Sequence, residues 1–586
     1  MPSAKLPSPT TTLVQLTPSQ AKRLYSVIQF YCVLKDALPQ PSSANTSDDD
    51  SIVSTPDNDR ALYKCFVNKV AQICDTKHGG DTVTSAMIVQ PGQVEYWIAS
   101  NSRNKTQMAA VKKFLSDDIL AALKSMRAKD LEDETKTREF SSTLMKKIVA
   151  HCRWRFYKYV KGLVVNVGAC IDSCARDNGL EASMSTRLGK LLPIAERVVA
   201  TWPHDIISFV QQTHNLLQAL EEAYTSSFSS FLRGKAGDDE RRDTAPPWSE
   251  TRHAIGRLHS YTIAVRVFIA ARKKWPDLFE SPEVIAYASP PKLGNPLQIK
   301  ERMCTGKDLL NRVTTDGEAH AAYQSLLPHF QAIDFDARLK ESIKDPKCIT
   351  TVHAEVTLLS RFHKEVLRPS PGREDAHWTF FMEDRFGRYI GCSKPTCLLC
   401  DYYFDSFPIK VDRRPGHGNL YHKWRVADIQ GPVDPGVERL IEDRKNTIEK
   451  MIKKLKDEVT RVLKERRGLK GSKYDSRHTP SDPFGSVVTA AGSVRGHALS
   501  DGPSIIGLAQ IGHGSVGNGS VTGRTKFREV ILEEVVEGEN EDDGNGGECM
   551  EGESVEELGR LMGQLGVSGG LRNDEDDDDD EGGAKI

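Results

Sequence analysis

The spacing of apolar and polar positions predicts a helix near the start of the chain. Apolar residues recur at helical intervals over 18–37, with Thr17 as a candidate N-cap and Pro18 at the first helical position. Residues 40–58 are polar and rich in Ser, Asp and Pro, which is typical of a linker. We therefore expect an isolated helix, then a linker, before the main body of the chain.

The pattern then changes from a period near 3.6 to short apolar runs. A helix is expected over 60–75, and strands are expected over 81–90 and 94–101. Pro91 and Gly92 separate the two runs and mark a turn. The order predicted for this segment is helix, strand, strand.

From about 105 to 345 the apolar stripes predict a helical segment. One of its helices, over 145–163, interleaves basic and aromatic residues in the stretch HCRWRFYKYVK. Such a mixture can hold a nucleic-acid strand through phosphate contacts and stacking. It also fits the solvent-facing side of an amphipathic helix. We favour the amphipathic interpretation and keep nucleic acid as a candidate partner.

The character of the sequence changes again over 346–430. Helices are expected over 350–362 and 396–404, and strands over 377–383 and 388–393. This alternation of helices and strands is typical of an α/β domain.

The last part of the chain is charged and then of low complexity. A long helix is expected over 436–468, and after about 470 Gly, Ser and Asp dominate. The acidic end cannot bury enough apolar surface to order itself, although the amphipathic stretch 554–566 is a candidate site for a protein partner. Residues 512–517 match the glycine pattern of a dinucleotide loop, but no helix follows, so we treat the match as a coincidence.

Composition narrows the functional classes only slightly. The 586 residues include 79 Lys and Arg against 81 Asp and Glu, so no global charge directs the chain to nucleic acid or membranes. We see no signal peptide and no apolar run of about 18 residues, so we expect no membrane span and an intracellular location, in the cytoplasm or nucleus. The 12 cysteines do not form a secreted disulfide framework.

Three cysteines stand within nine residues, at 392, 397 and 400. The spacing of Cys392, Cys397 and Cys400 fits an iron–sulfur site, which would need Cys549 from the low-complexity tail as its fourth ligand. It also fits a structural zinc site if Cys392 or His417 is a ligand.

A third interpretation includes two residues upstream. His353 and Glu355 stand at the start of one predicted helix, and Cys397 and Cys400 at the start of another. One His and two Cys bind zinc and leave a fourth position open for water, whose pKa the metal lowers. Glu355, beside the metal, can move the proton of that water. The residues therefore predict a hydrolytic zinc site.

These motifs resemble the cytidine deaminase-like superfamily, whose signature is H-x-E followed by P-C-x-x-C. Residues 353–355 read H-A-E, but 395–397 read P-T-C, with one extra residue after the proline. The chain is most similar to a divergent fungal group of nucleic acid/nucleotide deaminases, through 390–400 and the G-H-G-x-x-Y-x-x-W stretch at 416–424.

The resemblance implies a cytidine deaminase-like three-layer α/β/α sandwich, a Zn²⁺ cofactor and a nucleobase-containing substrate. It makes His353, Cys397 and Cys400 metal ligands and Glu355 the catalytic residue, and Cys392 a small buried residue. It also implies substrate-binding roles for the three residues Asn101, His417 and Trp424. A catalytically inactive zinc-binding scaffold is the alternative, although a scaffold has no need of Glu355.

Because the opening helix and strands stand far before the H-A-E motif, we expect a discontinuous domain with a large all-helical insertion and a disordered acidic C-terminal tail. The predicted parts are an N-terminal helix and linker, the first part of the deaminase-like domain, the insertion, the zinc-binding part, a charged helix and the tail. In that order they span 1–57, 58–104, 105–345, 346–435, 436–470 and 471–586.

Overall fold

The computed structural model describes seven segments of the chain: 12–38, 59–174, 179–241, 247–297, 305–345, 348–431 and 434–466. The predicted linker and tail, with the glycine pattern and the amphipathic stretch, lie outside the described residues. So does Cys549. No helix among the described residues is both long and apolar enough to cross a membrane.

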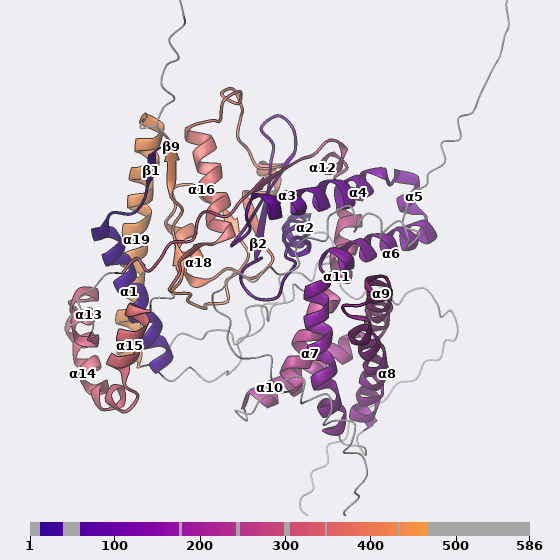
Figure 1. The fold of residues 1–586 in the computed structure, drawn as a ribbon, viewed down its shortest axis with the longest axis horizontal. Coiled ribbons are helices and arrows are strands. Elements are labelled where there is room, and N and C mark those ends of the chain that lie inside the picture. Colours follow the sequence, from indigo (N-terminus) through magenta and orange to yellow (C-terminus); the bar gives the residue numbers. More distant parts are fainter. Residues whose placement is uncertain are drawn as a thin grey trace, which may run out of the picture. The chain divides into compact units, whose positions relative to one another are not determined.

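Five strands form one sheet in the order β4-β3-β2-β6-β7. Its central strand, β2, is labelled in Figure 1. In this order the strands span Glu283–Tyr287, Glu95–Ser100, Thr84–Val89, Tyr389–Cys392 and Asp412–Arg413. β2 pairs antiparallel with β3 on one side and with β6 on the other, where Ser85 stands opposite Cys392. The two early strands and the segment with the cysteines therefore share one sheet.

Helices cover both faces of this sheet. Because side chains alternate along a strand, Ala86 and Ile88 of β2 join one buried cluster, whereas Met87 and Val89 join another. α2 (Asp59–Ile73) packs on the first face, and α16 (Ala354–Leu367) packs on the second. This arrangement is consistent with a deaminase-like α/β fold.

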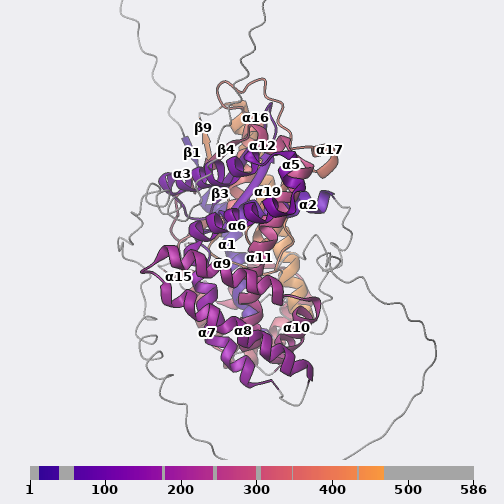
Figure 2. The same ribbon diagram turned by 90° about the vertical axis from the view of Figure 1, so that its right-hand side faces the viewer.

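A large helical segment lies between β3 and β4 in the sequence. Its longer helices are α6 to α11, and α7 packs against α8 and α11 (Figures 1 and 2). The helices in this segment are α3 Lys105–Lys113, a π-helix Phe114–Leu120, α4 Ala121–Ser125, α5 Ala128–Glu132, α6 Glu134–His151, α7 Arg153–Asp172, α8 Gly179–Thr201, α9 Ile206–Ala223, α10 Ser226–Arg241, α11 Pro247–Lys274 and α12 Asp277–Glu280.

The insertion is not all-helical, because β4 extends the sheet parallel to β3. A run of only five residues, EVIAY, forms this strand. The strand expected over 377–383 is also wrong, since Phe380 makes only an isolated bridge with Val89. The chain turns at Met382, whose φ is 45°, and enters the short helix α17 (Glu383–Phe386).

The amphipathic interpretation of 145–163 holds for the apolar residues, since Ile148, Phe156 and Leu163 are fully buried. Two helices, α6 and α7, replace the single helix and meet at Cys152. Arg155 departs from the expectation, because it is 2% exposed rather than part of a solvent-facing side.

The remaining helices pack with α16 on the second face of the sheet. α19 (Pro435–Glu465) contacts α1, α14, α16 and α18. Thr17 is the N-cap residue of α1, as the sequence predicts, and it forms a capping box with Gln20. The other elements here are β1 Thr12–Val14, α1 Pro18–Ala37, α13 Gly306–Val313, α14 Gly317–Ala332, α15 Phe335–Lys344, β5 Thr351–Val352, α18 Leu398–Ser406, β8 Trp424–Arg425 and β9 Ile429–Gly431.

Gly391 fixes how closely α2 approaches β6. A Cβ atom at Gly391 would lie 2.8 Å from the Val67 carbonyl carbon and 2.9 Å from the Asn68 nitrogen. We therefore expect Gly391→Ala to lower the free energy of unfolding by about 1–3 kcal/mol in urea denaturation. Gly189→Ala is the control, because nothing lies within 4 Å of a Cβ there. Equal stability of Gly391→Ala and the native chain would contradict this packing.

Candidate metal centre

Two helix starts bring the predicted ligands together. His353 is the N-cap residue of α16, and Cys397 is the N-cap residue of α18. Neither helix start depends on a conventional capping side chain: His353 makes no side-chain cap bond, and the Cys397 Sγ accepts the Cys400 N–H at 3.4 Å. The positive end of each helix dipole therefore points toward the same small region.

The three ligand atoms converge there. His353 Nδ1 lies 3.5 Å from Cys397 Sγ and 3.3 Å from Cys400 Sγ. All three ligand atoms lie within 4.8 Å of one another. One imidazole nitrogen and two sulfurs at this separation are a donor set that zinc prefers.

The electrostatics of the two thiols differ. Burial opposes ionisation of Cys397, but the hydrogen bond from Cys400 and the charge of His353 outweigh it and lower the pKa of Cys397 well below its usual value. Burial and the hydrogen bond with Cys397 raise the pKa of Cys400. One thiolate is therefore favoured before any metal binds, and metal binding would release the proton of the second.

Glu355 lies in the first turn of α16 and is 3% exposed. Burial raises the pKa of its carboxyl group, and the charge of Cys397 raises it further, while His353 lowers it. The Glu355 carboxyl group is thus held beside the three ligands in a setting that favours uptake of a proton.

Asn101 ties the end of β3 to the start of α16. Its Oδ1 accepts the Ala354 N–H at 2.9 Å, and its Nδ2 donates to the Gly80 carbonyl oxygen at 2.9 Å. The residue stands beside the metal centre, as expected, but both ends of its amide already bond to backbone. Substrate binding by Asn101 stays a prediction, and the structure shows that it positions α16.

Comparison with known families bears directly on this site. Residues 352–428 match a family model described as "OTT_1508_deam:-like deaminase". These residues form a cytidine deaminase-like domain. Neither the curated proteins nor the solved structures compared with the chain gave a match. The deaminase-family match begins after β2 and β3 in the sequence, and β6, which lies within the match, pairs with β2.

Trp424 of the deaminase domain lies against a ligand. β8 pairs in parallel with β5, so Trp424 stands opposite Thr351, just before His353. The indole Nε1 donates to Cys400 Sγ at 3.3 Å, and the ring is fully buried. This position supports the cysteine, whereas the predicted stacking of Trp424 on a base stays a prediction.

His417 and Tyr421 lie next to each other near His353. The Tyr421 ring centroid is 6.1 Å from that of His353 and 5.9 Å from that of His417. His417 Nδ1 accepts the Asn419 N–H at 3.0 Å, and its substrate role remains a prediction. Sequence reasoning did not select Tyr421, although it is the aromatic position within the G-H-G-x-x-Y-x-x-W motif.

The other metal interpretations find no support in the described residues. Cys392 is buried in β6, and burial raises the pKa of its thiol. Neither Cys392 nor His417 belongs to the His353, Cys397 and Cys400 group within the described part of the chain. Cys392 therefore has the place expected for a small buried strand residue.

The hydrogen bond from Trp424 gives a prediction for metal affinity. Trp424→Phe keeps an aromatic ring but removes the N–H that orients Cys400, so zinc affinity should fall by roughly 10–100-fold. Competition with a chromophoric chelator measures this change. Trp378→Phe is the control, since the Trp378 ring packs on Trp97 with centroids 5.5 Å apart. Unchanged affinity in Trp424→Phe would exclude a role in holding the ligand.

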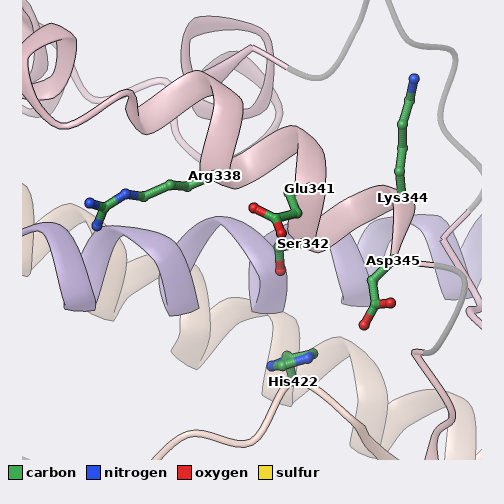
Figure 3. Close-up of a pocket in the computed structure, with 6 residues that line it drawn as sticks. All are labelled: Arg338, Glu341, Ser342, Lys344, Asp345 and His422. Carbon is green, nitrogen blue, oxygen red and sulfur yellow. The ribbon is translucent and has the colours of Figure 1, made fainter. Parts of the chain in front are cut away.

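A pocket of about 530 Å³ opens elsewhere on the domain, beside α15 (Figure 3). Acidic and basic side chains both line it, so it favours no ligand of a single charge. His422 reaches it, with Nδ1 at 4.0 Å from Cys32 Sγ, while the Lys344 side chain extends away from His422. The lining residues are Arg338, Glu341, Ser342, Lys344, Asp345 and His422. None of them is a candidate ligand of the metal centre.

Proposed function

We propose that the chain is a zinc-dependent hydrolytic deaminase of a nucleobase in a nucleoside, nucleotide or nucleic acid. The observation that carries this proposal is the convergence of His353 Nδ1 with two cysteine sulfurs beside the buried Glu355. Three ligands of this kind suit zinc and leave one coordination position for a reactant. The deaminase-family match over 352–428 supports the same reaction class.

His353, Cys397 and Cys400 would hold the zinc, which when bound supplies a water molecule activated near neutral pH. Glu355 lies close enough to the ligands to interact electrostatically with His353 and Cys397. Its carboxylate would take one proton from the water and deliver it to the ring nitrogen of the nucleobase, and then pass the second proton of that water to the departing amine. Over the whole reaction, a C–O bond replaces a C–N bond and ammonia leaves.

One observation favours a second function, a zinc-binding scaffold without turnover. The amide of Asn101 is bonded to backbone at both ends, and Trp424 is fully buried. Two of the three predicted substrate residues therefore face the protein. The buried carboxyl group of Glu355 argues against the scaffold, because burying an acid beside the three ligands has a cost that a catalytic role explains.

Ammonia release separates the two functions. The zinc-loaded full chain should be incubated with cytosine, adenine and guanine substrates, each as nucleoside, nucleotide and single-stranded polynucleotide. Ammonia from one base, with the matching change in its absorbance spectrum, would establish the deaminase. A chain that binds zinc but releases no ammonia from any of them would establish the scaffold.

A further inference from the structure

Arg257 of α11 is a charged side chain inside the protein, and two of its guanidinium nitrogens have no hydrogen-bond partner in the described part of the chain. The residue is 4% exposed, and its Nε and Nη2 atoms are buried without a hydrogen-bond partner among the residues that the structure describes. An unpaired buried guanidinium is costly, and it is a strong donor for any anion that reaches it. Binding of an anion at Arg257 would therefore offset the cost of burying its charge.

The charged side chains that act on Arg257 carry the same sign. Burial and the positive charges of Arg155 and Arg414 lower the pKa of Arg257, Tyr159 and Tyr261 raise it, and the result is a pKa of about 10. These residues come from α7, α11 and the segment just after β7. Repulsion between three arginines adds to the cost of leaving the site without an anion.

The carboxylate of Asp75, which pairs with Arg155, is already occupied. Asp75 forms an ion pair with Arg155, and it accepts hydrogen bonds from Thr82 Oγ1 and Ser393 Oγ, both at 2.7 Å. Arg414 bonds through Nη1 to the carbonyl oxygen of Ser393 at 3.1 Å. Asp75 therefore balances Arg155, and none of these bonds to Asp75 involves Arg257.

More basic groups stand on the side that faces solvent. His78 and Lys158 are exposed, and Lys394 is partly exposed. Although the His78 residue is exposed overall, partial burial of its ring lowers its pKa, and the charges of Arg155, Lys394, Lys158 and Arg257 lower that pKa further. The buried arginines and these outer groups thus form one basic cluster that extends from the interior to the surface.

The basic cluster and the metal centre share one end of the sheet. β2 begins there with Thr84, which pairs with Ser100 at the end of β3, and Ser85 pairs with Cys392 at the end of β6. Ser393 of the cluster donates its N–H to the Thr84 carbonyl oxygen at 2.9 Å. Four residues after Ser393 comes Cys397, so a single loop joins the cluster to the metal centre.

We propose that Arg257, Arg155 and Arg414 bind a phosphoryl group where the helical segment meets the sheet. The planar guanidinium group pairs with phosphate oxygens through two parallel hydrogen bonds, which explains why arginines rather than lysines lie at the buried end. The phosphoryl group has two sources, the phosphate of a nucleotide substrate or free phosphate. Only the first source rests on the proposed deaminase function.

The first experiment measures the thermal stability of the full chain in sodium phosphate and in sodium chloride of matched ionic strength. Phosphate should raise the melting temperature of the native chain, because a ligand of the folded state alone stabilises it. Arg257→Met should abolish that rise, and without phosphate it should be at least as stable as the native chain, since it removes an unpaired buried charge. No phosphate effect on the native chain would overturn the site, whatever the variant does.

Arg312→Met is the matched control. Arg312 of α13 also has two buried guanidinium nitrogens without a hydrogen-bond partner in the described segments, but it is not among the residues acting on Arg257. The Arg312→Met variant should keep the full response to phosphate. Equal loss of the response in both variants would mean a general charge effect and would overturn the site.

The second experiment separates the sources by equilibrium binding of cytidine and cytidine 5′-monophosphate, without turnover. If the phosphate belongs to the substrate, the monophosphate binds more tightly, and Arg257→Met reduces that advantage by roughly 10–100-fold. If cytidine and its monophosphate bind equally while phosphate still stabilises the chain, free phosphate is the ligand. If the chain releases no ammonia but phosphate still stabilises it through Arg257, the proposed deaminase function is wrong and the phosphoryl site stands.

Discussion

Glu355→Gln should leave the zinc content and the melting temperature close to those of the native chain and lower the deamination rate by about 10²–10⁴-fold. The amide has the shape of the carboxyl group, so the buried first turn of α16 keeps its packing. It cannot take up a proton, so water loses its base and the departing amine loses its acid. Steady-state ammonia release, with zinc measured on the same samples, checks this result.

Glu365→Gln provides a control on the same helix. Glu365 is 8% exposed, so this variant also replaces a buried carboxylate by an amide. The Glu365 oxygens accept hydrogen bonds from the N–H and the hydroxyl group of Ser370. We expect turnover in this variant to stay within about twofold of native, since its bonds lie outside the proton path. Native turnover in Glu355→Gln would remove Glu355 from the mechanism, and loss in both variants would indicate damage to α16.

The sequence carried most of the information about the metal centre, because each half of it is local. An N-cap position and its first turn span only a few residues, so His353 and Glu355 on one helix, and Cys397 and Cys400 on another, are fixed by short motifs. That the two helix starts would meet followed from resemblance, and the separations of their ligand atoms bear it out.

Long-range pairing set the limit of the sequence-based prediction. β4 is short, follows a helical stretch and pairs with a strand far away in sequence, so neither its length nor its surroundings mark it. Arg155 sits within a helix whose pattern suggests a solvent-facing position, yet Asp75 from α2's end holds it inside. Whether a charged side chain is buried depends on its ion-pair partner on the neighbouring element, and the periodicity along one helix does not reveal that partner.

Trp424 shows a similar limit within the motif itself. The motif predicts that the tryptophan belongs to the site, and the structure places it there, but behind Cys400 rather than on an open wall. The parallel pairing of β8 with β5 decides which way the ring faces. A motif therefore indicates the members of a site more readily than the role of each member.

Cys397→Ser should lose most of its zinc after dialysis, whereas Cys392→Ala should retain about one zinc per chain, as one site requires. The Cys397 thiol is the group whose pKa is lowered well below its usual value, so it is the first ligand in its thiolate form. A serine hydroxyl group does not ionise near neutral pH. Because loss of an outer-shell partner alone costs about 10–100-fold in affinity, loss of this ligand should cost more.

Cys392→Ala is the matched variant because Cys392 is equally buried and lies only five positions earlier, on β6. Because Gly391 faces α2, the next side chain along β6, that of Cys392, points to the opposite face of the sheet, where it hydrogen-bonds the Glu355 carboxyl group. The variant should lose about 1 kcal/mol of stability while it keeps the metal. Zinc measured by atomic emission on both purified proteins decides the result. Loss of zinc from Cys392→Ala, with zinc retained by Cys397→Ser, would reverse the ligand assignment. It would indicate a structural zinc site that includes Cys392 of β6, with no open coordination position for water.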